Sequence, residues 1–130
     1  MRYFAALLVL LLGLASAARA ADPVVGLWKT QEDDGAFAHV EFAPCGDRLC
    51  GTIVRTFNAE GEYRSENIGR RLVWDMRPAG EGKYEGGRIW QPSTDRIFKS
   101  KMTLSGDILK VAGCVAGGLI CKKQTWTRLR

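Results

Sequence analysis

Residues 96–129 read RIFKSKMTLSGDILKVAGCVAGGLICKKQTWTRL, and this stretch decides the fold. At its start the apolar residues Phe98, Met102 and Leu104 alternate with two lysines and a threonine. Such alternation is typical of an antiparallel strand that has one face on a core and the other in water. Two further strand-like runs follow, each after a turn that contains glycine. The stretch therefore predicts antiparallel strands joined by short turns.

The same pattern extends back through the chain, where a β-rich run recurs about every eight to twelve residues. Short connections favour pairing between neighbouring strands, and closing the sheet removes the edges that an open sheet exposes. We therefore predict an all-β fold, a small eight-stranded antiparallel up-and-down barrel. The predicted strands are Val24–Gln31, Phe37–Ala43, Leu49–Phe57, Arg70–Arg77, Lys83–Trp90, Arg96–Leu104, Ile108–Val115 and Leu119–Leu129.

The four cysteines form two close pairs. Cys45 and Cys50 bracket Gly-Asp in PCGDRLCG, whereas Cys114 and Cys121 bracket Gly-Gly in GCVAGGLIC. Two strands joined by such a turn bring the flanking side chains within bridging distance. Neither spacing is typical of a zinc site, and the chain has a single histidine. We predict the disulfides Cys45–Cys50 and Cys114–Cys121, and no metal site.

The N-terminus has the pattern of a secretory signal. Arg2 precedes the apolar run Phe4–Leu14, and the small-x-small motif ARA ends at Ala20. The run is eleven residues long, whereas a membrane-spanning helix needs about twenty. We expect a signal peptide over residues 1–20 with cleavage after Ala20, no membrane span, and a single barrel domain over residues 22–130. An even number of cysteines agrees with a periplasmic or secreted protein.

The charge balance argues against a nucleic-acid partner. The formal charge of the whole chain is +5. Removal of residues 1–20 leaves 17 basic and 14 acidic residues, a net charge of +3. We interpret the basic groups on the predicted outward faces as solvated side chains. They are Arg70 with Arg71, Lys99 with Lys101, and Lys122 with Lys123.

The residues offer little chemistry for catalysis, which needs a nucleophile, a base and an orienting group. The only histidine, His39, shares a strand face with Glu41, and we interpret the two as solvent-facing. Asp33 and Asp34 precede Gly35 and indicate a hairpin turn rather than a calcium site. We expect no enzyme activity and no cofactor. A hydrolase that uses His39 ranks last among the function classes.

Two short motifs carry a resemblance. The first predicted strand contains GLW, with Gly26 and Trp28, and the last contains TWTRL, with Trp126 and Arg128. Together they resemble the calycin pattern of lipocalins and their kin. The resemblance implies that Trp28 plugs the closed end of the barrel and that Arg128 lies across its ring in a cation–π contact. The resemblance also implies that Gly26 and Trp126 belong to the same barrel base.

Four longer segments carry a second resemblance: GLWKTQEDDG, HVEFAPCGDRLCGTIV, KYEGGRIWQP and KSKMTLSGDILKVAGCVAGGLICKKQTWTRL. They resemble the bacterial exported family catalogued as domain of unknown function 2147, over nearly all of residues 22–130. The stretch Asn58–Met76 departs from the form associated with that family. The resemblance implies a lipocalin-like barrel, similar in architecture to streptavidin, and no particular activity.

The apolar strand faces predict what fills or lines the barrel. Methionine and tryptophan line adaptable pockets more readily than tight cores. We therefore expect a non-catalytic binding module for a small apolar or amphipathic ligand, with a cavity that opens near the segment Asn58–Gly69. That segment is either a lid or a plain solvated loop. The candidate cavity residues are Trp74, Met76, Trp90, Phe98, Met102 and Leu109.

Eight-stranded barrels are also found filled by their own side chains. The alternative is therefore a structural or protein-interaction domain of the cell envelope, with an envelope protein as its partner.

Overall fold

The computed structural model describes residues 21–130, so the predicted signal peptide lies outside the described residues. Within this range no helix is long and apolar enough to cross a membrane. The described chain contains nine strands and one short 3-10 turn, η1 (Ala116–Gly118). The strands are β1 (Gly26–Lys29), β2 (Phe37–Cys45), β3 (Arg48–Asn58), β4 (Gly61–Tyr63), β5 (Arg71–Pro78), β6 (Lys83–Gln91), β7 (Arg96–Ser105), β8 (Ile108–Val115) and β9 (Ile120–Arg128).

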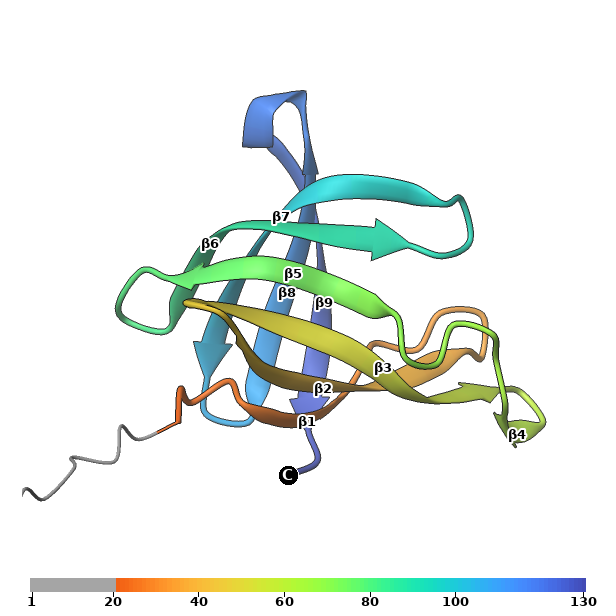
Figure 1. Cartoon of the computed structure of the whole chain (residues 1–130). Coiled ribbons are helices and arrows are strands. Elements are labelled where there is room, and N and C mark those ends of the chain that lie inside the picture. The colour runs from red at the N-terminus through yellow and green to blue at the C-terminus, as the bar shows by residue number, and fades with distance from the viewer. Residues whose placement is uncertain (1–20) are drawn as a thin grey trace, which may run out of the picture.

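The sheet closes on itself as an antiparallel barrel (Figure 1). Strands pair in chain order, and β9 returns to pair with β1. Eight strands form the ring, which confirms the predicted up-and-down barrel. The ninth, β4, pairs only with β3 and lies outside the ring. It belongs to the segment Asn58–Gly69, where the sequence pattern does not predict a strand.

The barrel has two different ends. At one, which we call the closed end, residues 22–25 enter the barrel and residues 129–130 leave it. The tight turns β2–β3, β5–β6 and β7–β8 lie there too. At the other, the open end, the connections β1–β2, β3–β5, β6–β7 and β8–β9 emerge. In Figure 1 the β8–β9 hairpin rises beyond the neighbouring strands as a separate projection.

One cluster of apolar side chains fills the interior. The largest completely buried side chains are Trp28, Trp126, Phe42, Met76 and Leu109. Glycines on the neighbouring strands make room for them. A methyl group at Gly51 would press on Phe42, and one at Gly87 would collide with the sulfur of Met76. Interiors packed this closely tolerate little added volume, so the middle of the barrel is a packed core.

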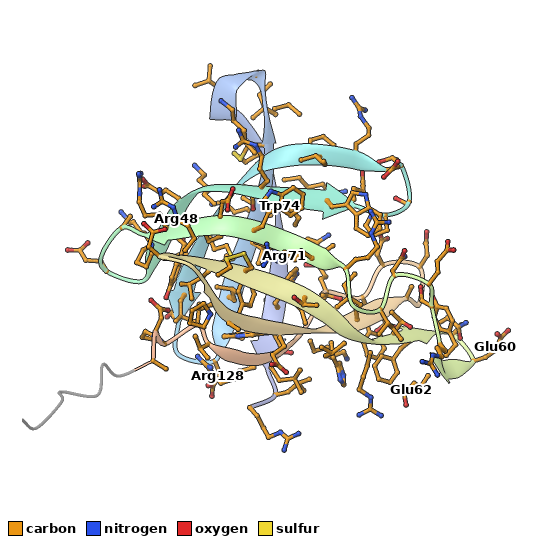
Figure 2. The ribbon with its side chains drawn as sticks, in the orientation of Figure 1. Arg48, Glu60, Glu62, Arg71, Trp74 and Arg128 are labelled. Atoms are coloured by element: carbon orange, nitrogen blue, oxygen red, sulfur yellow. A yellow bond between two sulfur atoms is a disulfide. The ribbon has the colours of Figure 1, made fainter. Side chains whose placement is uncertain are left out.

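Strand β5 does not alternate regularly. Val73 and Met76 are both completely buried, although they lie three residues apart. Asp75 between them adopts a left-handed backbone conformation, with φ 57°, which interrupts the period of two. Trp74, expected among the inward-facing residues, is therefore only partly buried (labelled in Figure 2), and Val73 takes the inward position.

Two local disulfides join neighbouring strands, with the pairing that the turn residues predict. Cys45–Cys50 links β2 to β3 at the closed end, with a Cα–Cα distance of 5.8 Å. Cys114–Cys121 links directly opposite residues of β8 and β9, with a Cα–Cα distance of 4.1 Å. The second bridge stands at the base of the hairpin that projects from the open end.

Candidate functional site

The closed end is built around the two motif residues of the first and last strands. Trp28 is completely buried, and its indole Nε1 donates to the Val24 carbonyl (2.9 Å). The Arg128 guanidinium carbon lies 4.4 Å from the centroid of the Trp28 ring. Arg128 Nη2 donates to the carbonyl of Pro23 (2.7 Å). These contacts tie the entering chain to the last strand, so this end is a structural base.

The other base residues complete the closure. Gly26 has φ 136°, and a Cβ there would collide with the Arg130 carbonyl. Trp126 is completely buried. The Tyr84 hydroxyl donates to a carboxylate oxygen of Asp22. Burial, and then this hydrogen bond, raise the pKa of Tyr84, so the hydroxyl stays protonated. The closed end is thus occupied by the protein's own side chains.

The residues predicted to line a cavity are part of the packed interior or lie at its margin. Met76, Met102 and Leu109 belong to the same core cluster as the two buried tryptophans. Phe98 and Trp74 are only partly buried. Trp90 belongs to that cluster too, so the structure brings four of the six candidates together, as packing partners.

Trp90 is also covered by side chains of the open-end connections. The Arg70 guanidinium carbon stacks 3.6 Å from the centroid of its ring, and its indole Nε1 donates to a carboxylate oxygen of Asp95 (2.8 Å). The open-end connections thus cover this tryptophan.

A different group of side chains gathers on the outer face of β1, β2 and β3, toward the open end. We call Lys29, Phe37, His39, Arg55 and Phe57 the aromatic cluster. Lys29 lies opposite His39 in the β1–β2 pair, and His39 lies opposite Arg55 in the β2–β3 pair. Phe37 lies opposite Phe57. Side chains of directly opposed residues share a sheet face, so register alone brings the five together.

The rings of the aromatic cluster stack. Phe37 and Phe57 are nearly parallel, at 7°, with centroids 4.6 Å apart. The His39 ring lies 4.6 Å from Phe57, tilted by 43°. Lys29 Nζ lies 4.3 Å from the Phe37 centroid, and the Arg55 guanidinium carbon lies 5.7 Å from that of Phe57. Both phenyl rings are only partly buried. The arrangement is a ring surface with cations beside it.

The charges of this region are arranged around His39. Arg55 donates from Nε and from Nη2 to the two carboxylate oxygens of Glu62 on β4. Partial burial, then the positive charge of Arg55 and that of Lys29, lower the pKa of His39, whereas Glu62 raises it. His39 Nδ1 is buried and has no hydrogen-bond partner among the described residues. The lowered pKa favours the neutral form of His39 at pH 7, and its ring packs against Phe57.

A shallow hollow of about 460 Å³ lies beside Arg55 and Glu62. Its lining is amphipathic, because aliphatic side chains and a phenol alternate with charged groups. The lining residues are Val54, Arg55, Glu62, Tyr63, Arg64 and Ile68. Four of the six come from the segment Asn58–Gly69, which contains a strand and is therefore not a plain loop. It adds β4 to β3 and returns along the outside, where the Gly69 amide donates to the Ile53 carbonyl (2.8 Å).

Figure 2 shows Glu62, on β4, well away from Arg128 near β1. The closed-end base and the aromatic cluster are therefore separate places on the molecule.

The acidic turn between β1 and β2 has hairpin geometry. Asp34 and Gly35 have φ 51° and 75°, as a type I′ turn requires. Asp33 and Ala36 exchange both backbone hydrogen bonds across it. Among residues 21–130, no three His, Cys, Asp or Glu side chains lie close enough together to hold a metal ion.

Sequence reasoning identified His39 but missed its partners. The available signal is an aromatic residue two positions before His39 and another two positions after Arg55, each on an outward-facing position. The phenylalanines become neighbours only through the β2–β3 register, which shifts at a bulge between His39 and Val40. A pattern within a single strand does not contain that register.

Among solved structures, the fold is similar to that of a Helicobacter pylori protein described as belonging to the lipocalin family. The TM-score is 0.68, and the alignment covers 85% of each chain at 16% sequence identity. At that identity the likeness concerns the fold alone. No curated protein matches the sequence significantly.

The model of one protein family matches residues 26–128, from the GLW motif on β1 to Arg128 on β9. That family is described as an uncharacterized protein conserved in bacteria. The match covers every strand of the barrel and both disulfides. The chain therefore belongs to the bacterial family DUF2147, and its fold is a lipocalin-like barrel.

Proposed function

We propose that this protein is a non-catalytic binding module of the bacterial cell envelope that takes a small amphipathic ligand on the outside of its open end. One observation carries the proposal. The stacked, partly exposed rings of Phe37 and Phe57 lie beside cationic groups, and one of these, Arg55, also lines the amphipathic hollow at β3 and β4. Small-molecule sites typically combine an apolar surface with a few convergent polar groups.

The interior of the barrel is a poorer place for a ligand. Its largest side chains are completely buried, and a methyl group added at Gly51 or Gly87 already lacks space. A ligand there would have to displace packed side chains, at the usual cost of overpacking. The proposal thus keeps the expected ligand class but places the ligand outside the barrel.

The chemistry of the surface indicates what the ligand carries. A flat apolar group gains contact by stacking on the phenyl rings. Lys29 and Arg64 offer positive charge. Arg55 uses Nε and Nη2 to bind Glu62, so the N–H groups of its Nη1 remain available to an anionic group. A small molecule with an apolar ring or chain and one anionic group fits both features.

Export is part of the proposal. The N-terminal signal pattern supports it, and so do the two disulfides, which persist in an oxidising compartment. The absence of catalysis rests on His39, whose ring packs at a tilt against Phe57 and whose pKa lies below its ordinary value.

The test uses anilinonaphthalene sulfonate, a fluorescent probe with aromatic rings and one anionic group. We expect saturable binding, and a weakening of about tenfold, equivalent to about 1.4 kcal/mol, in both Phe57→Ala and Arg55→Gln. Met102→Leu, which changes a buried core side chain without adding volume, and Leu119→Ser, which removes an exposed leucine elsewhere, leave the affinity unchanged. Binding that Met102→Leu weakens and that Phe57→Ala and Arg55→Gln both spare would place the ligand inside the barrel and overturn the proposal.

A further inference from the structure

The tip of the β8–β9 hairpin exposes apolar side chains to an unusual degree. Leu119 is 88% exposed, Ile120 64% and Val115 47%. All three lie within six consecutive residues at the end of the projection in Figure 1. Single exposed apolar residues are common on protein surfaces, but several gathered on a projecting tip mark an interaction site.

The tip is held in its exposed form. Cys114 and Cys121 are directly opposed and disulfide-bonded, so the two strands cannot separate below it. Above the bridge, Ala116, Gly117 and Gly118 all have positive φ, and the Leu119 amide donates to the Ala116 carbonyl (3.3 Å). The apolar side chains are thus presented on a short, cross-linked loop.

Lysines surround the hairpin directly below the tip. Lys99 pairs with Cys114, and both Lys101 and Lys123 pair with Ala112, so these three lysines share the outer face that carries the disulfide. Lys122 pairs with Gly113 and lies on the other face. We call these four lysines the basic collar. The ion pairs among residues 21–130 involve Arg48, Arg55 and Arg128, so the collar has no acidic partner there.

The collar belongs to a wider asymmetry of charge. Residues 96–130 contain eight lysines and arginines but one acidic residue, Asp107. That carboxylate lies at the closed end and pairs with Arg128 (3.1 Å). Residues 21–95 contain nine basic and thirteen acidic residues. The positive charge of the barrel is therefore concentrated on β7, β8 and β9, the strands that carry the tip.

We propose that this hairpin docks on the surface of an anionic phospholipid bilayer. Leu119, Ile120 and Val115 enter the boundary between headgroups and acyl chains, while the basic collar binds the headgroup phosphates. We choose a membrane as the partner because of the order of these residues along the hairpin. An anionic membrane has an apolar interior below a layer of negatively charged headgroups, which matches an apolar tip followed by a ring of lysines. The long lysine side chains reach the phosphates while their methylene stems cover apolar surface. The hairpin is a surface separate from the proposed ligand site.

The test measures binding of the full mature protein to vesicles by co-sedimentation. The vesicles are phosphatidylcholine alone, or phosphatidylcholine with about one-third phosphatidylglycerol. We expect binding to the anionic vesicles and much weaker binding to the neutral ones. Lys122→Gln and Lys123→Gln should each weaken anionic binding about fivefold, since one basic residue near such a surface contributes about that factor. Leu119→Ser with Ile120→Ser should abolish it, whereas Ile108→Ser, an exposed isoleucine at the closed end, should have no effect.

A second measurement keeps the proposal independent of vesicle sedimentation. A Leu119→Trp variant should shift its added tryptophan emission to shorter wavelength on anionic vesicles only, because the indole then enters an apolar boundary. Equal binding to both vesicle types, or no loss in the Leu119→Ser and Ile120→Ser variant, would overturn the proposal. The proposal would also be overturned if the wild-type protein were a dimer and this variant a monomer, because the tip would then contact a second copy of the chain. Probe binding at the aromatic cluster is unaffected by these variants, so the two proposals fail separately.

Discussion

The closed end and the open end of this barrel use the same kind of contact in opposite ways. At the closed end, Arg128 lies over Trp28, a ring that is completely buried. At the open end, Lys29 and Arg55 lie beside Phe37 and Phe57, which are only partly buried. The first contact is enclosed by the entering chain and stabilises the fold. The second leaves ring surface accessible, so it can serve a ligand.

The largest expected effect tests the structural half of this comparison. Trp28→Ala should lower the free energy of unfolding by about 3 to 5 kcal/mol, the usual range for a large buried aromatic. Phe57→Ala should cost about 1 kcal/mol, as expected for a partly exposed side chain. Urea unfolding followed by circular dichroism measures both. Equal losses in the free energy of unfolding would mean that the aromatic cluster stabilises the fold as much as the closed-end base does.

The two disulfides allow the second comparison, since one lies at each end. Replacing either pair by serine should cost about 2 to 2.5 kcal/mol, because the closed loops are of similar, short length. Only the Cys114→Ser and Cys121→Ser variant should also weaken vesicle binding, since it loosens the exposed tip. Peptide mapping without reduction checks the pairing, and a peptide that joins Cys45 to Cys121 would contradict the fold as described.

A smaller effect separates ring contact from charge at the closed end. Arg128→Lys keeps the charge but loses the planar group over Trp28 and the fork that reaches Pro23. We expect a loss of about 1 kcal/mol in the free energy of unfolding. Arg64→Lys at the open end, where the guanidinium lines an exposed hollow, is the matched control and should be neutral. If Arg128→Lys also left the free energy of unfolding unchanged, the contact with Trp28 would stabilise the fold through its positive charge alone.

The smallest effect is a pH dependence that originates in His39. Burial, Arg55 and Lys29 lower the pKa of His39 in the folded protein, so below its ordinary pKa of about 6.5 the unfolded chain binds a proton that the folded chain resists. Stability should therefore be fully present above that pH and fall as the pH drops below it. Glu62→Gln should steepen the fall, because Glu62 raises the pKa of His39. Urea midpoints between pH 5.5 and 7.5 measure the slope, and His39→Gln should flatten it.

Much of the fold was predictable because each strand carries its own signal. The alternation around Phe98 and Met102 places β7, and the turn residues between Cys45 and Cys50 place the β2–β3 hairpin with its disulfide. The irregularities were not predictable in the same way. Asp75 breaks the alternation of β5 through its backbone conformation, and this moved Trp74 out of the expected interior set.

The candidate site was less predictable than the fold. The aromatic cluster depends on which residue of β2 faces which residue of β3, and the bulge after His39 sets that register. The exposure of the hairpin tip could not be predicted from the sequence for another reason. Leu119 and Ile120 extend an apolar pattern that usually indicates a core, and only the length by which the hairpin projects shows that no core covers them.

The central claim is that the interior is a packed scaffold and that ligands bind on the outer face of the open end. Amide chemical shifts recorded during a titration with anilinonaphthalene sulfonate test it residue by residue. We predict shifts in residues 37–39 of β2, 54–58 of β3 and 61–64 in and after β4, with little change around Met102 and Leu109. Shifts concentrated on Met102, Leu109 and the strands around them would show a ligand inside the barrel and contradict the claim.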